Sequence, residues 1–298
     1  MTHQLPSSGL RRRKIVLLCP ALLLHACGSA DASAHAAVTA TPVASAPAEC
    51  AAVKTASGAL TTTVLIDRTT HLEMRDREAL GQQLVDRWQR EGGRFIVATT
   101  GGRISALYRT LFDAALPPGD DATSRWTQTP NDRKRAIACQ AALLARLREA
   151  LGHALGDVDA SHEAVSPVIE ALAALFPGNA GPGPGRLVYV SDGIEHTQGL
   201  SFYAGQDRVR ALNPTAIVEA LKRQGALPRL NGVSVEHVGI GQPAPPREGG
   251  RPKLRPPAEM RSLEATWTAI YSAAGASSVS FGHPLLPPVR KTLQSGAP

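Results

Sequence analysis

The distribution of apolar and polar positions predicts short strands that alternate with amphipathic helices. Apolar runs bounded by turn or charged residues predict strands at Thr62–Asp67, Arg94–Ala98, Arg186–Ser191, Val233–Ile240 and Ser278–Phe281, with an edge strand around 107–112. Apolar residues at helical spacing predict helices at Met74–Arg90, Asn131–Leu155, Glu163–Phe176, Pro214–Gln224 and Ala258–Ala274. Strands and helices therefore alternate along residues 59–284.

Three of these helices have a predicted buried stripe. The stripe of the first helix contains Leu80, Leu84, Val85 and Trp88. That of the second contains Ile137, Leu144, Leu147, Leu151 and Leu155. That of the third contains Val165, Val168, Ile169, Leu172 and Phe176, with Pro167 in the first turn, where proline is tolerated.

The order of elements predicts the fold class. Strands that alternate with helices of this length imply crossover connections and a mainly parallel sheet that helices cover on both faces. The expected architecture is therefore α/β, a doubly wound three-layer sandwich. Ligands of such sheets bind outside the carboxyl ends of the strands, where the strand order reverses.

The amino terminus has the features of an export signal. Four basic residues at 11–14 precede an apolar run that is too short to span a membrane, and Leu24-His-Ala-Cys27 follows it. These four residues resemble the bacterial lipobox, which implies that residues 1–26 are removed and Cys27 is lipidated. The alternative is a secreted protein that is cut at a nearby Ala-x-Ala site. Position 28, directly after the lipidated cysteine, is a glycine and not the aspartate that often retains lipoproteins in the inner membrane. The lipoprotein is therefore expected in the outer membrane, where it would face the periplasm or the cell surface.

Composition divides the remaining chain. Residues 27–58 are rich in Ala, Ser, Thr and Pro and predict a flexible tether, whereas 59–284 form one domain and 285–298 a tail. Residues 1–26 carry four basic and no acidic side chains, so their removal lowers the formal charge from +7 to +3. The basicity is mostly a targeting signal, and nucleic acid is not an expected partner.

Two cysteines remain after processing. In an oxidising envelope Cys50 and Cys139 are expected to form a disulfide, worth about 4 kcal/mol in the chain-entropy model. The alternative is a pair of unrelated buried thiols. No Cys or Cys/His spacing in the sequence matches a zinc site.

Two predicted strands end in an aspartate. Asp67 ends the first strand, and Asp192 follows the Arg186–Ser191 strand. Two carboxylates at one edge of a sheet would repel each other unless a cation or a proton lies between them, and they would suit a hard cation. The alternative is local: Asp67 caps the loop that follows it, and Asp192 begins a tight Asp-Gly turn.

These strand ends resemble the von Willebrand factor type A family over about residues 60–282. In that family Asp-x-Ser/Thr-x-Ser ends the first strand, Ser-Asp-Gly ends the fourth, and both loops bind a cation, usually Mg²⁺. The resemblance implies metal ligands at Asp67, Thr69 and Asp192, with an acidic group of a protein partner completing the coordination sphere. His71 replaces the second hydroxyl of the first motif, and its nitrogen would suit manganese, zinc or iron better than magnesium.

The family also supplies a threonine from a middle loop, which has no clear counterpart in this sequence. Ser161 lies nearest in order, with Asp159 beside it. Both are therefore further candidate ligands.

The expected function is binding rather than catalysis. The sequence contains no Gly-x-Ser-x-Gly elbow, phosphate loop or dinucleotide fingerprint. Two alternatives stay open: a metal-independent structural role in an envelope or secretion assembly, and metal-assisted hydrolysis at Asp67, His71, Asp192 and His196. The basic, proline-rich segment Gln242–Pro257 is expected to be a solvated loop, or else to contact an acidic partner or lipid phosphates.

Overall fold

A computed structural model describes residues 50, 60–102, 106–116, 129–158, 165–177, 185–204, 208–243 and 255–287. Its strands are β1 (Thr61–Asp67), β2 (Gly93–Thr100), β3 (Arg109–Leu116), β4 (Gly185–Val190), β5 (Val233–Val238) and β6 (Ser278–Gly282). Its helices are α1 (Met74–Glu91), α3 (Pro130–Gly156), α4 (Val168–Leu175), α5 (Pro214–Gln224) and α6 (Pro257–Ala273). The predicted order of elements is confirmed.

The strands form one mixed sheet in the order β3-β2-β1-β4-β5-β6. The pairs β1–β2, β1–β4, β4–β5 and β5–β6 are parallel, and only the edge strand β3 runs antiparallel to its neighbour. The chain builds outward in one direction from β1 and then returns to its other side with β4. The order therefore reverses between β1 and β4, the position at which doubly wound sheets bind ligands.

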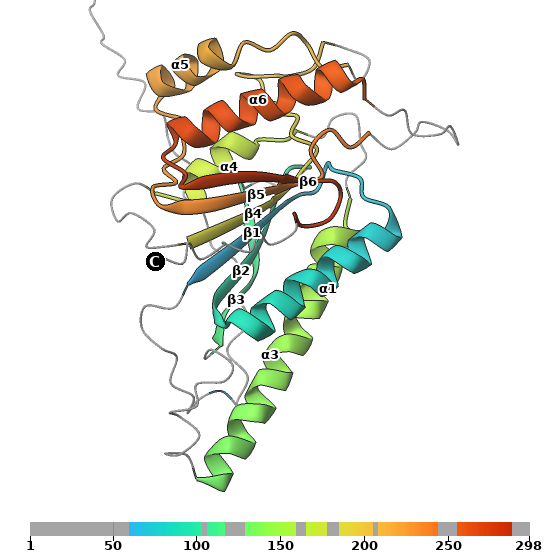
Figure 1. Ribbon diagram of the computed structural model, residues 1–298, viewed down its shortest axis with the longest axis vertical. Coiled ribbons are helices and arrows are strands. Elements are labelled where there is room, and N and C mark those ends of the chain that lie inside the picture. The colour runs from blue at the N-terminus through green and yellow to red at the C-terminus, as the bar shows by residue number, and fades with distance from the viewer. Residues whose placement is uncertain are drawn as a thin grey trace, which may run out of the picture. The chain divides into compact units, whose positions relative to one another are not determined.

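Helices cover both faces of the sheet, as Figure 1 shows, so the predicted α/β three-layer sandwich is confirmed. One apolar cluster packs α1 and α3 against one face, and a second packs α4, α5 and α6 against the other. The central strands β1 and β4 are buried along most of their length because both faces are covered.

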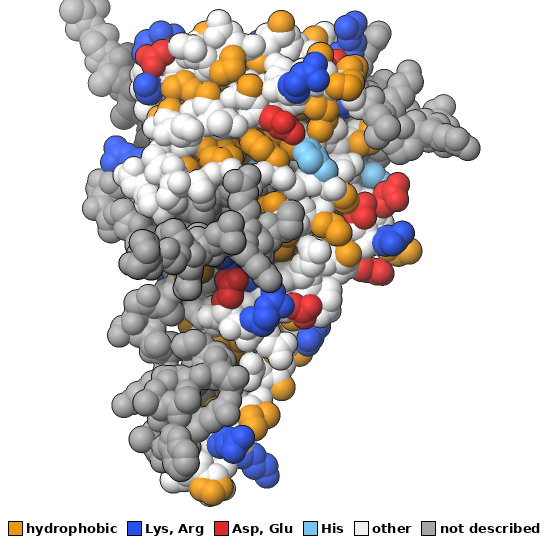
Figure 2. All heavy atoms as spheres, in the orientation of Figure 1, with side chains coloured by type: hydrophobic (Ala, Val, Ile, Leu, Met, Phe, Trp, Pro, Cys, Tyr) orange, Lys and Arg blue, Asp and Glu red, His pale blue; other side chains and the backbone are white. Residues whose placement is uncertain are grey.

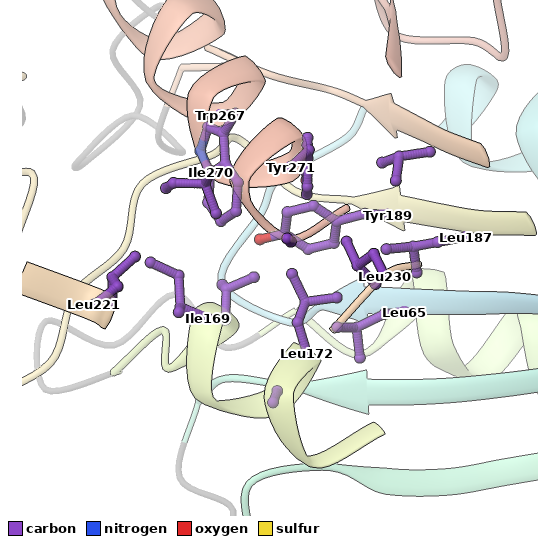
Figure 3. Packing of buried hydrophobic residues seen from close by; sticks show 14 of the residues in the cluster. Leu65, Ile169, Leu172, Leu187, Tyr189, Leu221, Leu230, Trp267, Ile270 and Tyr271 are labelled. Atoms are coloured by element: carbon purple, nitrogen blue, oxygen red, sulfur yellow. The ribbon is translucent and has the colours of Figure 1, made fainter. Parts of the chain in front are cut away.

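Aromatic side chains fill the core beneath α6. Trp267 and Tyr271 of α6 lie against Tyr189 of β4 and are fully buried, as Figure 3 shows. The ring centroids of Trp267 and Tyr271 are 5.2 Å apart, and those of Trp267 and Tyr189 are 5.6 Å apart. This packing holds α6 over the strand whose end carries Asp192.

Ile137 and Val165 were predicted to be buried, and both predictions are wrong. Ile137 is 59 % exposed, because the first turns of α3 extend past the sheet and the buried positions of this helix begin at Cys139 (Figure 1). Val165 is 41 % exposed and pairs with Gly102 in an isolated bridge, outside the helix. Helix α4 begins only at Val168, with Pro167 as its N-cap.

The two cysteines expected to pair are joined in the structure. Cys50 and Cys139 form a disulfide that spans 89 positions of the sequence and connects the carboxyl-terminal part of the predicted tether to α3. Cys139 is buried beside Leu143 in the cluster that packs against α1. The bond therefore fastens the part of the predicted tether around Cys50 to the long helix.

Several sequence predictions concern residues that the structure does not describe. The signal peptide, Cys27, nearly all of the tether, and the candidate ligands Asp159 and Ser161 lie outside the described residues. Within the described residues no helix is both long and apolar enough to cross a membrane. On the face drawn in Figure 2, Lys and Arg side chains are interspersed with Asp and Glu.

Candidate functional site

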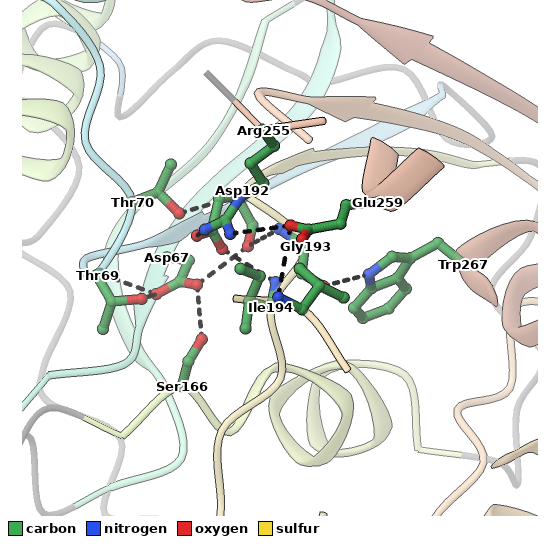
Figure 4. A network of polar contacts seen from close by, with 12 residues as sticks. Asp67, Thr69, Thr70, Ser166, Asp192, Gly193, Ile194, Arg255, Glu259 and Trp267 are labelled. Carbon is green, nitrogen blue, oxygen red and sulfur yellow. Dashed lines mark hydrogen bonds and ion pairs between the residues drawn. The ribbon is translucent and has the colours of Figure 1, made fainter. Parts of the chain in front are cut away.

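Asp67 lies buried at the carboxyl end of β1, where the strand order reverses. We use the word crevice for the buried polar cluster that Asp67 and Asp192 form at the ends of β1 and β4. Oδ1 of Asp67 accepts hydrogen bonds from the Thr69 amide at 2.9 Å and the Thr69 hydroxyl at 2.7 Å. Its Oδ2 accepts from the hydroxyls of Ser166 at 2.6 Å and Ser191 at 3.0 Å. Figure 4 shows this network. The carboxylate thus ties the end of β1 to the segments before α4 and after β4.

Ser166 is the hydroxyl that the sequence analysis missed. It is buried in the segment directly before α4, and its backbone pairs with that of His196. Ser161 was chosen because it lies nearest to the family's threonine in order, yet Ser166 is the serine that reaches Asp67. Pro167 was the sequence feature that could have identified Ser166. A proline marks a helix boundary, so it places Ser166 at the end of the loop before α4.

Gly101, just after β2, allows the chain to pass close to Asp67. A Cβ on Gly101 would lie 2.5 Å from Asp67 Oδ1, and the residue has φ +78°. A side chain is thus excluded by contact and disfavoured by backbone conformation. The chain after β2 therefore packs against the Asp67 carboxylate without displacing it.

Asp192 lies on the opposite side of the crevice, after β4. Its Oδ1 accepts from the Ile194 amide at 3.0 Å, and its own amide donates to the Thr70 hydroxyl at 2.9 Å. Its Oδ2 lies 3.6 Å from Nη2 of Arg255, a residue just before α6 whose side chain is 4 % exposed. Arg255 also lies 4.0 Å from the carboxylate of Glu259 (Figure 4).

Both aspartates also bond their own loops, as the local alternative expects. Asp67 accepts from the amide two residues later, and so does Asp192. These bonds explain the conformations of the two loops. Each carboxylate also has a second oxygen that faces other segments of the chain.

Burial governs the electrostatics of this crevice. Desolvation raises the pKa of Asp67, although hydrogen bonds from Ser166, Thr69 and Ser191 oppose the change. Desolvation raises the pKa of Asp192 to about 7; Arg255 lowers it, whereas the charge of Asp67 adds to the increase. The two carboxylates therefore lie in a place where negative charge is unfavourable and a cation would be favoured.

A layer of buried groups positions the end of β4. His237 Nε2 lies 3.2 Å from the Ser191 carbonyl, and His237 Nδ1 lies 3.2 Å from the Tyr271 hydroxyl. Burial lowers the pKa of His237 to about 3, so this ring is neutral at physiological pH. Trp267 Nε1 donates to the Gly193 carbonyl at 2.7 Å. The Ser-Asp-Gly turn is thus anchored to β5 and α6.

Three polar residues near the aspartates, His71, His196 and Glu195, donate no hydrogen bond to the Asp67 carboxylate among the described residues. Within the described part of the chain, the four hydrogen bonds to the Asp67 carboxylate come from Thr69, Ser166 and Ser191, and His71 contributes none. The ring of His196 contacts Ser201 and Tyr203. Glu195 is buried, and its carboxylate accepts a hydrogen bond from the Ile169 amide in the first turn of α4.

A basic cleft begins next to the crevice. It has a volume of about 420 Å³ and lies between the β2–β3 edge and α3. Arg68, the residue after Asp67, lines it together with Arg109, Arg146 and His153, while Glu149 and Asp157 add negative charge. Arg68 pairs with Asp157 at 2.8 Å.

The oxygen donors fit a hard cation better than a soft one. Carboxylate and hydroxyl oxygens converge from the loops after β1 and β4 and from the segment before α4, and such oxygens suit Mg²⁺ or Mn²⁺. Among the described residues, no three His, Cys, Asp or Glu side chains gather into one cluster, so hydroxyls would have to supply much of the coordination. Neither a family model nor a curated protein matches this chain.

Proposed function

We propose that this protein is a binding domain of the von Willebrand factor A type, which recognises a protein partner at the crevice between β1 and β4. The observation that carries the proposal is the convergence of two buried carboxylates and three hydroxyls at the switch point of the sheet. Fold alone does not assign a function, so the proposal depends on these side chains.

Asp67, Thr69, Ser166 and Asp192 would hold the divalent cation. A bound Mg²⁺ or Mn²⁺ would neutralise the two aspartates and offer an open coordination position to an acidic side chain of the partner. The chain's own part is to keep the oxygens together: Gly101 allows close approach, and His237 and Trp267 anchor the end of β4.

The basic cleft supports an acidic partner. Arg68, Arg109 and Arg146 line it together with Glu149 and Asp157, so a carboxylate of the partner would meet a small excess of positive charge beside the crevice. Exposed pairs contribute mainly to association rate and orientation, so the crevice would supply the specific contact.

We also propose that Cys27 carries a lipid and that the domain is displayed from the outer membrane on the tether formed by residues 27–58. The basis is the signal and the lipobox-like Leu24-His-Ala-Cys27. Metabolic labelling with a fatty acid should mark the wild-type chain and leave Cys27→Ser unlabelled. Labelling of both chains, or of neither, would oppose lipidation at this residue.

A metal-independent role is the second candidate, and Arg255 favours it. Its guanidinium already lies beside Asp192 and supplies a positive charge to the crevice. In this case the domain would bind its partner through the same fold without an exchangeable cation.

Cation titration tests the first candidate. We expect calorimetry with Mg²⁺ and Mn²⁺ to show saturable binding to the purified chain, strongly reduced in Asp67→Asn and unchanged in the exposed control Glu78→Gln. The immobilised chain should retain envelope proteins in the presence of Mg²⁺. It should not retain them when a chelator is added, and the immobilised Asp67→Asn variant should not retain them at all. Partners retained equally in chelator would instead support the metal-independent role, and absence of any cation binding would refute the metal mechanism.

A further inference from the structure

The crevice already contains a positive charge that belongs to the chain. Arg255 comes from the segment between β5 and α6, and its side chain is 4 % exposed. Figure 4 shows its guanidinium directed at Asp192, with Glu259 on its other side. The sequence alone placed this arginine in a solvated basic loop, so its position beside the aspartate is a property of the tertiary structure.

The contacts of Asp192 show which oxygen the arginine uses. Oδ1 is engaged by the Ile194 amide at 3.0 Å, and Oδ2 lies 3.6 Å from Arg255 Nη2. Oδ2 is therefore the oxygen with most freedom to serve a cation, and it is also the one that faces the guanidinium. A divalent cation at this oxygen would lie close to a buried positive charge, and like charges in a low-dielectric site repel strongly.

Glu259 gives the guanidinium a second anchor. It lies one helical turn after Arg255, with its carboxylate 4.0 Å from Nη1, and it is also 3.5 Å from the Val209 amide. An arginine between two carboxylates can shift its contacts toward one when the other is taken by a different cation. Such a shift needs side-chain movement only.

We propose that Arg255 is the residue that sets the cation affinity of this crevice: its guanidinium occupies Asp192 when no divalent cation is bound and competes with one for Oδ2. Glu259 opposes it by drawing the guanidinium away. This inference rests on the proposed function, since it concerns the same carboxylates. Cation binding would then depend on whatever weakens the contact between Arg255 and Asp192.

The test compares Mn²⁺ binding by calorimetry in the full chain and in three variants. Arg255→Gln keeps a polar side chain and removes the charge, Glu259→Gln removes the second anchor, and Arg261→Gln removes an exposed charge from the same helix as a control. We expect Arg255→Gln to bind Mn²⁺ at least tenfold more tightly than wild type, Glu259→Gln to bind more weakly, and Arg261→Gln to match wild type.

Melting temperature supplies an independent measurement. In chelator, Arg255→Gln should melt at a lower temperature than wild type, because Asp192 has lost its resident cation. Added Mn²⁺ should raise the melting temperature of Arg255→Gln by more than it raises that of wild type. This readout does not depend on any partner.

The outcomes separate the two proposals. Wild-type binding of Mn²⁺ with equal or weaker affinity in Arg255→Gln would overturn the competition and leave the proposed function standing. Binding by neither protein would overturn both. If Arg255→Gln does not fold, Glu259→Gln decides the question, since affinity equal to or tighter than that of wild type would contradict an opposing anchor.

Discussion

The raised pKa of Asp192 predicts that the metal-free protein loses stability as the pH rises. The unfolded chain releases this proton near the ordinary aspartate pKa of 3.8, whereas the folded protein releases it at a pKa of about 7. Between these values the folded state binds more protons than the unfolded state, so the free energy of unfolding falls with increasing pH. The contribution of protonated Asp192 to the free energy of unfolding is therefore fully present below pH 3.8 and is lost as the pH rises through 7.

The size of the effect follows from the two pKa values. A difference of one pKa unit corresponds to 1.36 kcal/mol, so the whole change is about 4 kcal/mol, of which about 3 kcal/mol falls between pH 5 and pH 8. Asp192→Asn keeps the shape and the acceptor for the Ile194 amide but cannot ionise. Replacing this candidate ligand should therefore make the metal-free protein less sensitive to high pH.

Urea denaturation followed by tryptophan fluorescence, in chelator at pH 5 and pH 8, measures this difference. From pH 5 to pH 8, the free energy of unfolding of wild type should fall by about 3 kcal/mol more than that of Asp192→Asn. Contributions from Asp67 and Glu195, whose pKa values are also raised by burial, are present in both proteins and largely cancel. Glu78→Gln should follow wild type. Equal losses in wild type and Asp192→Asn would refute the reasoning.

Three further changes should lower the free energy of unfolding. Cys139→Ser removes the disulfide to Cys50 and should cost about 4 kcal/mol; wild type treated with reductant should resemble it. Gly101→Ala should cost at least about 2 kcal/mol and weaken Mn²⁺ binding, because its Cβ would overlap Asp67 and its φ is positive; unchanged Mn²⁺ affinity would contradict this packing. Trp267→Phe should cost about 3 kcal/mol by leaving a buried backbone carbonyl without its indole donor, and a loss below 1 kcal/mol would argue against that bond.

The candidate site was only partly visible in the sequence. Asp67 and Asp192 stand out because the first ends an apolar run and the second directly follows one, and strand ends meet at one edge of a parallel sheet. Thr69 was identified from its spacing to Asp67 in the family motif. Ser166 was missed because its distance from Asp67 in the chain is 99 residues and no local pattern relates the two. His71, a candidate from motif spacing, makes none of the four hydrogen bonds to the Asp67 carboxylate among the described residues.

The sequence by itself determined the order of strands and helices, and hence the α/β class, because apolar periodicity is a local property that each segment carries. Its errors at Ile137 and Val165 arose where burial depends on how far a helix extends past the sheet, or on where it begins. The tertiary structure alone decided that Arg255 lies beside Asp192. Proximity of residues distant in sequence depends on strand order and on the packing of α6 against β4, and neither is encoded in the residues that surround Arg255.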